Sequence, residues 1–429
     1  MSSYAGIYVN GKEVFTYRNE VYPQIMYLFA EAEYAHLTGD DALPYASNWY
    51  VHGDEGEGVE VHVYRVTASV LRDRLEVLGF GKTLVRRVVE SLVRQELNRK
   101  IAMLEHFSGP EHDEIRESIR QEAASLEHFD YSAWKRDVRQ HLAAKREAPE
   151  PDWRNKGPLV LFEEADERVL LRVIVDEVAD DAEVVLDITD LVDGGYLGED
   201  EDADEDWPST WDLGSGPPII ITEGSFDAYV LRNAIDVLKP HLTPYIKFLD
   251  YNVGNEGGAA AAVRMLRSFA AAGISNRLVA LFDNDSAAYE AVMALAGSGL
   301  PSHFAVMHYP DLPLAQEYPT LGPQGNTTMN VNRLAGSIEL YLGEDILRSQ
   351  VGELMPVQWK GYMGKVRTYQ GEIISKSAVQ SAFLDKVKTA KANPSIVASQ
   401  DWSGLQHIID ELIDTLSSLP KAASAGGTM

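Results

Sequence analysis

The 429-residue sequence contains no cysteine, which excludes disulfide bonds and thiolate metal sites. It also lacks an apolar run of 18 residues, so a transmembrane helix is not expected. The N-terminal stretch does not show the basic-then-apolar order of a secretory signal. Together these absences predict a cytoplasmic protein with no membrane partner, and the length suffices for two or three domains.

Basic residues are scarce relative to acidic ones. Lysine and arginine number 38 against 66 aspartates and glutamates, giving a net charge of −28. Proteins that bind nucleic acid usually carry a basic surface, because neutralising phosphates supplies much of their affinity. Part of the acidic excess lies in one block, EDEDADED, at residues 199–206. Because residues 82–100 and 359–367 remain basic, a nucleic-acid partner is disfavoured by the charge but not excluded.

Changes in composition divide the chain into four parts. Helical periodicity fills residues 68–145, two prolines interrupt it at 147–153, and an acidic and then Pro/Gly-rich stretch precedes residue 217. We therefore predict an α+β N-terminal domain at 1–150, a strand-rich extension and acidic linker at 151–210, an α/β domain at 216–345, and a C-terminal subdomain with a helix at 346–429.

The N-terminal parts offer two kinds of local signal. Asn10-Gly11 between β-rich runs predicts a hairpin. Alternation at 59–67 predicts a strand, and the apolar runs at 168–175 and 183–192 are interpreted as further strands.

From residue 217 onward, short apolar runs alternate with helical periodicity. The runs at 218–222, 245–251, 277–282 and 303–309 are separated by segments typical of amphipathic helices. This order predicts a Rossmann-like parallel sheet flanked by helices.

Carboxylates follow two of these expected strands. Glu223 ends the first, Asp227 comes four residues later, and Asp283 and Asp285 follow the third. Ligands bind at this edge of open α/β sheets. Carboxylates gathered there repel one another unless a cation is held, and Mg²⁺ prefers oxygen ligands. We predict a Mg²⁺ site, with Mn²⁺ as a substitute. The alternative interpretation is a helix cap and a first-turn acid at Glu223 and Asp227, with an ordinary strand-to-helix turn at Asp283–Asp285.

The pattern Glu223-Gly224-x-x-Asp227 followed sixty residues later by Asp283-x-Asp285 is similar to the Toprim domain of topoisomerases, bacterial primases and OLD-family nucleases. The resemblance covers residues 216–345. It implies that Glu223 binds the metal or moves a proton, and that Asp283 and Asp285 bind the metal.

Two residues further along suggest the OLD-type nucleases within this group. Such nucleases carry another acid after the motif, which implies that Glu339, in an expected helix, shares a second metal with Asp227. A partly exposed helical glutamate is the alternative. They also use a downstream lysine to stabilise the transition state. Lys376 is the first candidate for this role and Lys360 the second.

The N-terminal part opens with SSYAGIYVNGKEVF, continues with a mixed α/β leader and ends in an acidic linker. In these three features it resembles the module associated with HEPN or Toprim effectors. This implies a regulatory or assembly role in bacterial defence against phage, through abortive infection. Arg136 and His141 also have the R-x4-H spacing of HEPN ribonucleases. Two solvated residues on a charged helix are the favoured interpretation of that spacing.

The C-terminal part mixes aromatic and basic residues, which suits nucleic-acid contact and a packed subdomain equally. They are Trp359, Tyr362, Tyr369, Lys360, Lys365 and Arg367. The sequence as a whole predicts a Mg²⁺-dependent nuclease acting on DNA or RNA. A homo-oligomer, or a defence partner such as a separate ATPase, is expected to regulate it. The alternative is a non-catalytic scaffold that acts through oligomerisation.

Overall fold

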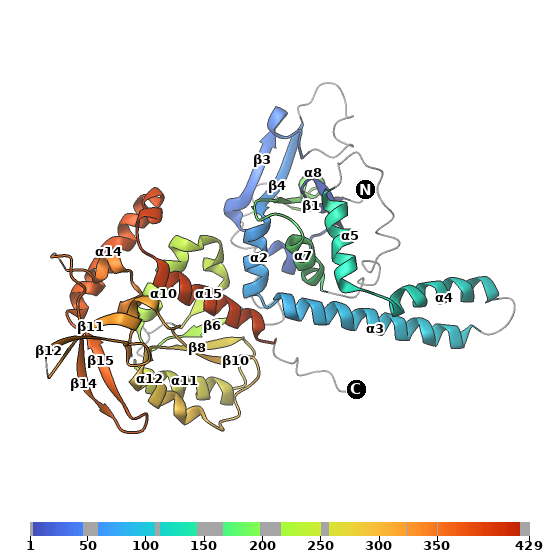
Figure 1. Ribbon diagram of the computed structural model, residues 1–429. Coiled ribbons are helices and arrows are strands. Elements are labelled where there is room, and N and C mark those ends of the chain that lie inside the picture. The colour runs from blue at the N-terminus through green and yellow to red at the C-terminus, as the bar shows by residue number, and fades with distance from the viewer. Residues whose placement is uncertain are drawn as a thin grey trace. The chain divides into compact units, whose positions relative to one another are not determined.

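The computed structural model describes residues 3–45, 59–107, 112–143, 166–197, 216–249, 257–323, 325–349 and 351–420, apart from the side chains of Asp137 and His141. The chain forms two compact units (Figure 1). One comprises Met1–Leu75 and Phe80–Gly214, and the other comprises Glu76–Gly79 and Ser215–Met429.

The first unit contains a five-stranded antiparallel sheet in the order β2-β1-β5-β4-β3. Its strands are β1 (Tyr4–Val9), β2 (Lys12–Arg18), β3 (Tyr34–Thr38), β4 (Glu60–Thr67) and β5 (Glu183–Asp187). Asn10 and Gly11 both have positive φ, 51° and 73°, as a tight hairpin turn requires. The predicted hairpin and the strand at 59–67 are confirmed.

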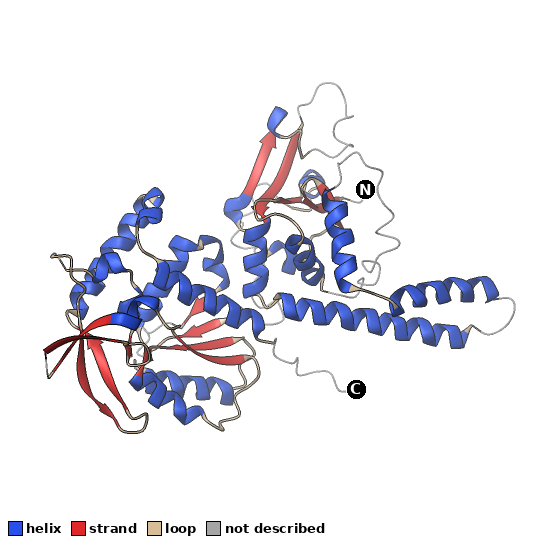
Figure 2. Ribbon diagram, in the orientation of Figure 1, coloured by secondary structure: helices blue, strands red, loops and turns tan. Residues whose placement is uncertain are grey.

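Helices occupy most of the remaining described part of this unit (Figure 2). The long ones are α2 (Ala68–Val77), α3 (Lys82–His106), α4 (Asp113–Glu127), α5 (Tyr131–Ala143) and α7 (Glu167–Asp176), and the short ones are α1 (Pro23–Met26), α8 (Thr189–Asp193) and the 3₁₀ turns η1 (Glu31–Glu33) and η2 (Gly39–Asp41). The helical periodicity over residues 68–145 is therefore confirmed where the structure describes it.

Helix α7 shows that the strand prediction for residues 168–175 is wrong. Each residue of RVLLRVIV is buried, and a fully buried helix presents the same unbroken apolar run as a buried strand. The carboxylate of Asp166 caps the helix by accepting the backbone N–H of Arg168 at 3.1 Å. The buried Arg172 is satisfied by Asp176 at 3.0 Å. Of the strand expected at 183–192, the first half is β5 and the second half is α8.

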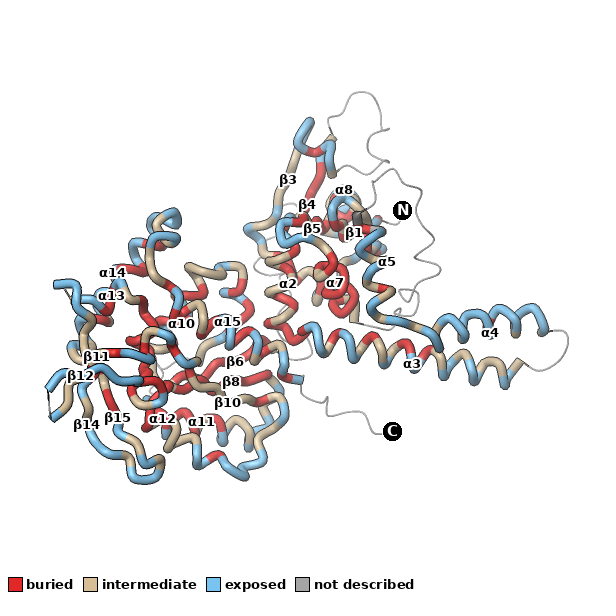
Figure 3. Tube along the Cα trace, in the orientation of Figure 1, coloured by how far each residue is buried: buried red, intermediate tan, exposed pale blue. Residues whose placement is uncertain are grey.

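The second unit is built on a parallel sheet in the order β10-β8-β6-β7. Its strands are β6 (Ile219–Ile221), β7 (Lys247–Phe248), β8 (Leu278–Phe282) and β10 (Phe304–His308). Every residue of β8 is buried, and the strand lies in the interior of the unit (Figure 3). The structure confirms a mixed α/β protein with a parallel sheet.

Helices cover both faces of this sheet (Figure 1). Helices α10 (Ser225–Leu238) and α15 (Ser403–Ser418) lie on one side, and α11 (Ala259–Ala271) and α12 (Ser286–Val292) lie on the other. The C-terminal helix α15 packs against β8 and β10, so it forms part of the same layered unit.

A second sheet, in the order β12-β11-β14-β15, joins residues on both sides of position 346. Its strands are β11 (Tyr318–Gly322), β12 (Gly325–Met329), β14 (Val357–Met363) and β15 (Thr368–Ile373). The remaining elements are β9 (Asn284–Asp285), β13 (Ala335–Gly336), α13 (Glu344–Leu347), α14 (Lys376–Ala392), η6 (Pro240–Tyr245), η7 (Met293–Leu295), η8 (Pro313–Glu317), η9 (Ile338–Tyr341) and η10 (Pro394–Ser399). Within the described ranges, no helix is both long and apolar enough to span a bilayer.

Candidate active site

The candidate site lies where β6 and β8, neighbours in the parallel sheet, each end in a carboxylate-bearing turn. Glu223 follows β6 and precedes α10, and Asp283 follows β8 and precedes α12. The two turns are joined directly, because Oε1 of Glu223 accepts the backbone N–H of Asp283 at 2.9 Å. The strand ends expected to meet therefore do meet.

Glu223 is held in an environment that favours its protonated form. Burial, followed by the charges of Asp285 and Asp227, raises its pKa from 4.5 to about 7. Hydrogen bonds from backbone N–H groups offset part of that rise. A carboxyl group with a pKa near neutrality can both accept and release a proton, as a general acid or base must.

A glycine turn closes over the backbone of Glu223. The N–H of Gly258 donates to the Glu223 carbonyl oxygen at 2.6 Å. Gly258 has φ +97°, a conformation that favours glycine over residues with a side chain. At Gly257 an added Cβ would lie 3.3 Å from the same carbonyl oxygen. These glycines let the start of α11 approach the Glu223 turn closely.

Asp227, in the first turn of α10, accepts a hydrogen bond from the hydroxyl of Tyr309 at 2.9 Å. Burial raises the pKa of Asp227 from 3.8 to about 6. This hydrogen bond opposes the rise, and the charge of Glu339 adds to it. Tyr309 is buried directly after β10. Tyr309 was not among the site residues predicted from the sequence, although its place at the C-terminal end of the predicted strand 303–309 was a usable signal.

Asp283 is the most deeply enclosed acid of the group. Burial raises its pKa well above the ordinary value, and the charges of Asp227, Glu223, Asp285 and Glu339 act in the same direction. Its Oδ1 atom is buried without a hydrogen-bond partner among the residues that the structure describes. A buried acceptor left without a partner is costly, and a bound cation would satisfy it.

Asp285 caps a helix, a role that the sequence did not predict for this residue. Its Oδ1 accepts the N–H of Ala288 at 2.8 Å and caps α12, while its Oδ2 accepts the side-chain amide of Gln370 at 2.6 Å. Both carboxylate oxygens therefore carry a hydrogen bond. Metal ligation by Asp285 stays a prediction.

Glu339 and Lys376 are brought to the same group of acids. Glu339 is fully buried, so the partly exposed alternative is wrong, and it sits in the 3₁₀ turn η9 rather than in the expected helix. Its Oε1 lies 3.2 Å from Nζ of Lys376, at the start of α14. Burial lowers the pKa of Lys376, but the charges of Glu339, Asp283 and Asp227 outweigh burial and raise it overall.

Glu339 is also fully hydrogen-bonded to neutral groups. Its Oε2 accepts the hydroxyl of Ser337 and its Oε1 accepts the amide of Gln380, each at 2.8 Å. Lys360, the second lysine candidate, instead pairs with Glu372 at 3.1 Å on the β14–β15 hairpin. The structure thus places Lys376, and not Lys360, beside the buried acids.

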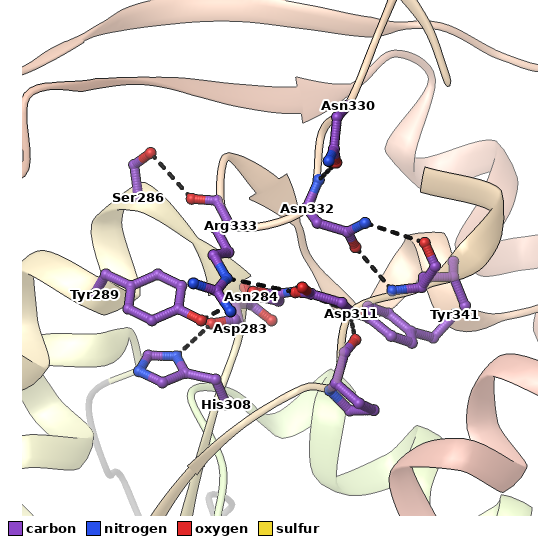
Figure 4. Close-up of polar contacts among 12 residues, drawn as sticks. Asp283, Asn284, Ser286, Tyr289, His308, Asp311, Asn330, Asn332, Arg333 and Tyr341 are labelled. Carbon is purple, nitrogen blue, oxygen red and sulfur yellow. Dashed lines mark hydrogen bonds and ion pairs between the residues drawn. The ribbon is translucent and has the colours of Figure 1, made fainter. Parts of the chain in front are cut away.

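A polar network continues from the middle residue of the Asp283-x-Asp285 turn (Figure 4). The buried Asn284 donates to Asp311 at 3.0 Å and accepts the hydroxyl of Tyr289 at 3.2 Å. The ring of Tyr289 stacks on His308, with centroids 3.9 Å apart, and His308 contacts the Asp283 carbonyl oxygen at 2.9 Å. Asp311 lies in the loop after β10 and supports this turn through Asn284.

A cavity of about 510 Å³ opens beside the acids, between α10 and α14. Its lining includes Ser225, Phe226, Arg232, Ser377, Gln380 and Leu384. Because Gln380 bonds to Glu339, and Ser225 lies between Glu223 and Asp227 in sequence, the cavity adjoins the acid group.

The donor set suits a hard cation held largely by water. The side chains are carboxylates, and the unpartnered Oδ1 of Asp283 is available for coordination. Across the described ranges, however, no group of three or more histidine, aspartate or glutamate side chains is arranged to hold a metal ion. Mg²⁺ usually keeps several waters and uses one or two carboxylates, so the residues fit that mode rather than an all-protein cage.

Comparison with known proteins concerns the first half of the chain. Residues 1–207 match the family model of HEPN/Toprim N-terminal domain 1, which confirms the resemblance noted for the N-terminal part. This match points to a nuclease-related or defence-related protein. No curated protein and no solved structure matches the chain. Arg136 and His141 share helix α5, but the side chain of His141 lies outside the described residues.

Proposed function

We propose that this protein is a metal-dependent nuclease with a Toprim-like core resembling that of OLD-family nucleases, acting in bacterial defence against phage by abortive infection. The observation that carries the proposal is the junction of Glu223 with the Asp283 turn at the carboxyl ends of two adjacent parallel strands. The HEPN/Toprim family match of residues 1–207 supports the same class of protein.

The proposed cofactor is Mg²⁺, with Mn²⁺ able to replace it. Asp283, whose Oδ1 has no hydrogen-bond partner among the described residues, would hold the ion with Glu223, and water would fill the other positions. The assignment of Asp285 as a further ligand, and of Asp227 and Glu339 to a second ion, stays a prediction from the sequence. The cation would neutralise charge on the phosphate undergoing cleavage.

The chain's own residues have distinct roles in this proposal. Glu223, with its pKa near 7, accepts a proton from the attacking water. Lys376 stays protonated beside Glu339 and stabilises negative charge that develops on the phosphate oxygens. Tyr309 orients Asp227 through its hydroxyl. A nearby cation lowers the pKa of buried carboxyl groups and so favours their charged form. Lys376 has this effect on Asp227.

The experiment is a cleavage assay with the full-length protein on plasmid DNA, single-stranded DNA and total RNA, in Mg²⁺, Mn²⁺ or EDTA. We expect cleavage that EDTA abolishes and that Glu223→Gln and Asp283→Asn each reduce by two orders of magnitude or more, on the order of the contribution of general-base catalysis. Glu411→Gln, an exposed carboxylate on α15, is the matched control and should leave cleavage unchanged. Failure to cleave any substrate would favour the non-catalytic scaffold.

A further inference from the structure

The hairpin formed by β14 and β15 exposes a pair of aromatic rings. Tyr362 and Tyr369 lie directly opposite each other in the antiparallel register, so their side chains project from the same face. Each is 57% exposed, and their ring centroids are 5.3 Å apart. Two large aromatic side chains held together in contact with solvent form a surface on which another planar group can stack.

The third aromatic residue of this segment, Trp359, has a different role. A Cβ added to Gly322 would lie 3.4 Å from its ring, and one added to Gly371 would lie 3.2 Å away. The indole therefore packs against the glycines of the neighbouring strands β11 and β15. The sequence favours nucleic-acid contact and packing equally for this segment. In the structure Trp359 packs, while the two tyrosines lie at the surface.

Cations flank the exposed rings in a chain that is otherwise strongly acidic. Residues 357–373 contain Lys360, Lys365 and Arg367 against the single acid Glu372, a net charge of +2 in a protein of −28. Lys360 pairs with Glu372 at 3.1 Å, and Lys365 pairs with Glu290 at 3.2 Å. Both lysines are more than half exposed, and exposed pairs of this kind are weak, so phosphates can compete for these cations.

Hydrogen bonds tie the hairpin to the turn that carries the candidate site. Gln370 donates to Oδ2 of Asp285 at 2.6 Å and accepts the N–H of Ala287 at 2.9 Å. The hydroxyl of Ser286 donates to the carbonyl oxygen of Tyr369 at 3.0 Å. The aromatic pair is therefore fixed in position relative to the Asp283-x-Asp285 turn.

We propose that the β14–β15 hairpin binds single-stranded nucleic acid, with bases stacked on Tyr362 and Tyr369 and phosphates held by Lys360, Lys365 and Arg367. Stacking of this kind requires bases with free faces, which a duplex does not offer. This inference rests on the proposed nuclease function, because it takes the bound strand to be the substrate. It adds that the substrate is single-stranded where it enters the site.

The test measures binding separately from cleavage. The affinity of the full-length protein for labelled oligonucleotides is measured by fluorescence anisotropy in EDTA. The probes are single strands of about 20 nucleotides, oligo(dT) and oligo(U), and a duplex of the same length. The double variant Tyr362→Ala/Tyr369→Ala should raise the Kd for single strands about 10-fold or more, since each stacked base contributes on this order. The Tyr362→Phe/Tyr369→Phe variant keeps the rings and should bind like the wild type.

Tyr4→Ala is the matched control, because Tyr4 is 50% exposed on β1 of the other unit, and it should leave binding unchanged. An unchanged Kd in the double alanine variant, or equal affinity for duplex and single strand, overturns the inference. If cleavage occurs while the alanine variant binds normally, the hairpin inference fails and the nuclease proposal stands. If the wild type binds single strands through the tyrosines but cleaves nothing, the nuclease proposal fails and the hairpin inference stands.

Discussion

Replacing Glu223 with glutamine should stabilise the cation-free protein at pH 8 and have little effect at pH 5. The folded protein raises the pKa of this carboxyl group from 4.5 to about 7, chiefly by burial. A carboxyl group whose pKa is higher in the folded than in the unfolded state contributes stability while it is protonated. That contribution is lost as the pH rises through the folded pKa. An amide stays neutral at both pH values.

The size of the effect follows from the pKa. A rise of the pKa from 4.5 to about 7 corresponds to about 3 kcal/mol between pH values below 4.5 and above 7. The glutamine carbonyl can still accept the Asp283 N–H, but more weakly than a carboxylate, and Asp227 titrates in the same range. We therefore expect a net gain of ~1–3 kcal/mol at pH 8, or ~2–12 °C in the melting temperature of the second unit.

Differential scanning calorimetry of the full-length protein in EDTA, at pH 5 and pH 8, measures this gain. Glu411→Gln serves again as the control, because its exposed carboxylate has no comparable burial. Added Mg²⁺ at pH 8 should then stabilise the wild type more than Glu223→Gln, since the stabilisation by a ligand that binds only the folded state increases with the logarithm of its concentration divided by its Kd.

The reasoning would be refuted by a variant that is destabilised at pH 8, or by an effect of equal size at both pH values. Either result would mean that the Glu223 carboxylate is well accommodated in its charged form without a cation. The burial-driven rise in pKa would then be wrong, and with it the case for Glu223 as a proton acceptor near neutral pH.

Three further outcomes follow from the contacts. Lys376→Met should lower the single-turnover cleavage rate at least 10-fold, whereas Lys391→Met, on the same helix but paired with the half-buried Asp236, should not. Tyr309→Phe removes the hydrogen bond that lowers the pKa of Asp227, so the acidic limb of the pH–rate profile should move to higher pH. Gly258→Ala forces a side chain onto φ +97° and should cost about 1–3 kcal/mol in urea unfolding, whereas Gly361→Ala, with open space and ordinary φ, should be near neutral.

Local patterning predicted the strands of the parallel sheet because an apolar run is a local signal, but it did not predict the sheet of β11, β12, β14 and β15. An apolar run of four to six residues between helical segments is sufficient to identify β6, β8 and β10, and their order implies a parallel sheet. Glu223 and Asp283 therefore had to meet at one edge once those strands were neighbours. Periodicity failed at α7, because burial on all sides removes the difference between a helical and a strand pattern.

What the sequence alone determined is that carboxylates end two strands of a parallel sheet in an acidic chain without cysteine. The tertiary structure decided what surrounds them. Tyr309 reaches Asp227 across 82 residues, and Gln370 reaches Asp285 across 85. These partners come from distant segments, and sequence spacing carries no information about contacts made by packing. Burial, which sets the pKa of Glu223 and leaves Oδ1 of Asp283 without a partner, is likewise a property of the assembled layers and of no single segment.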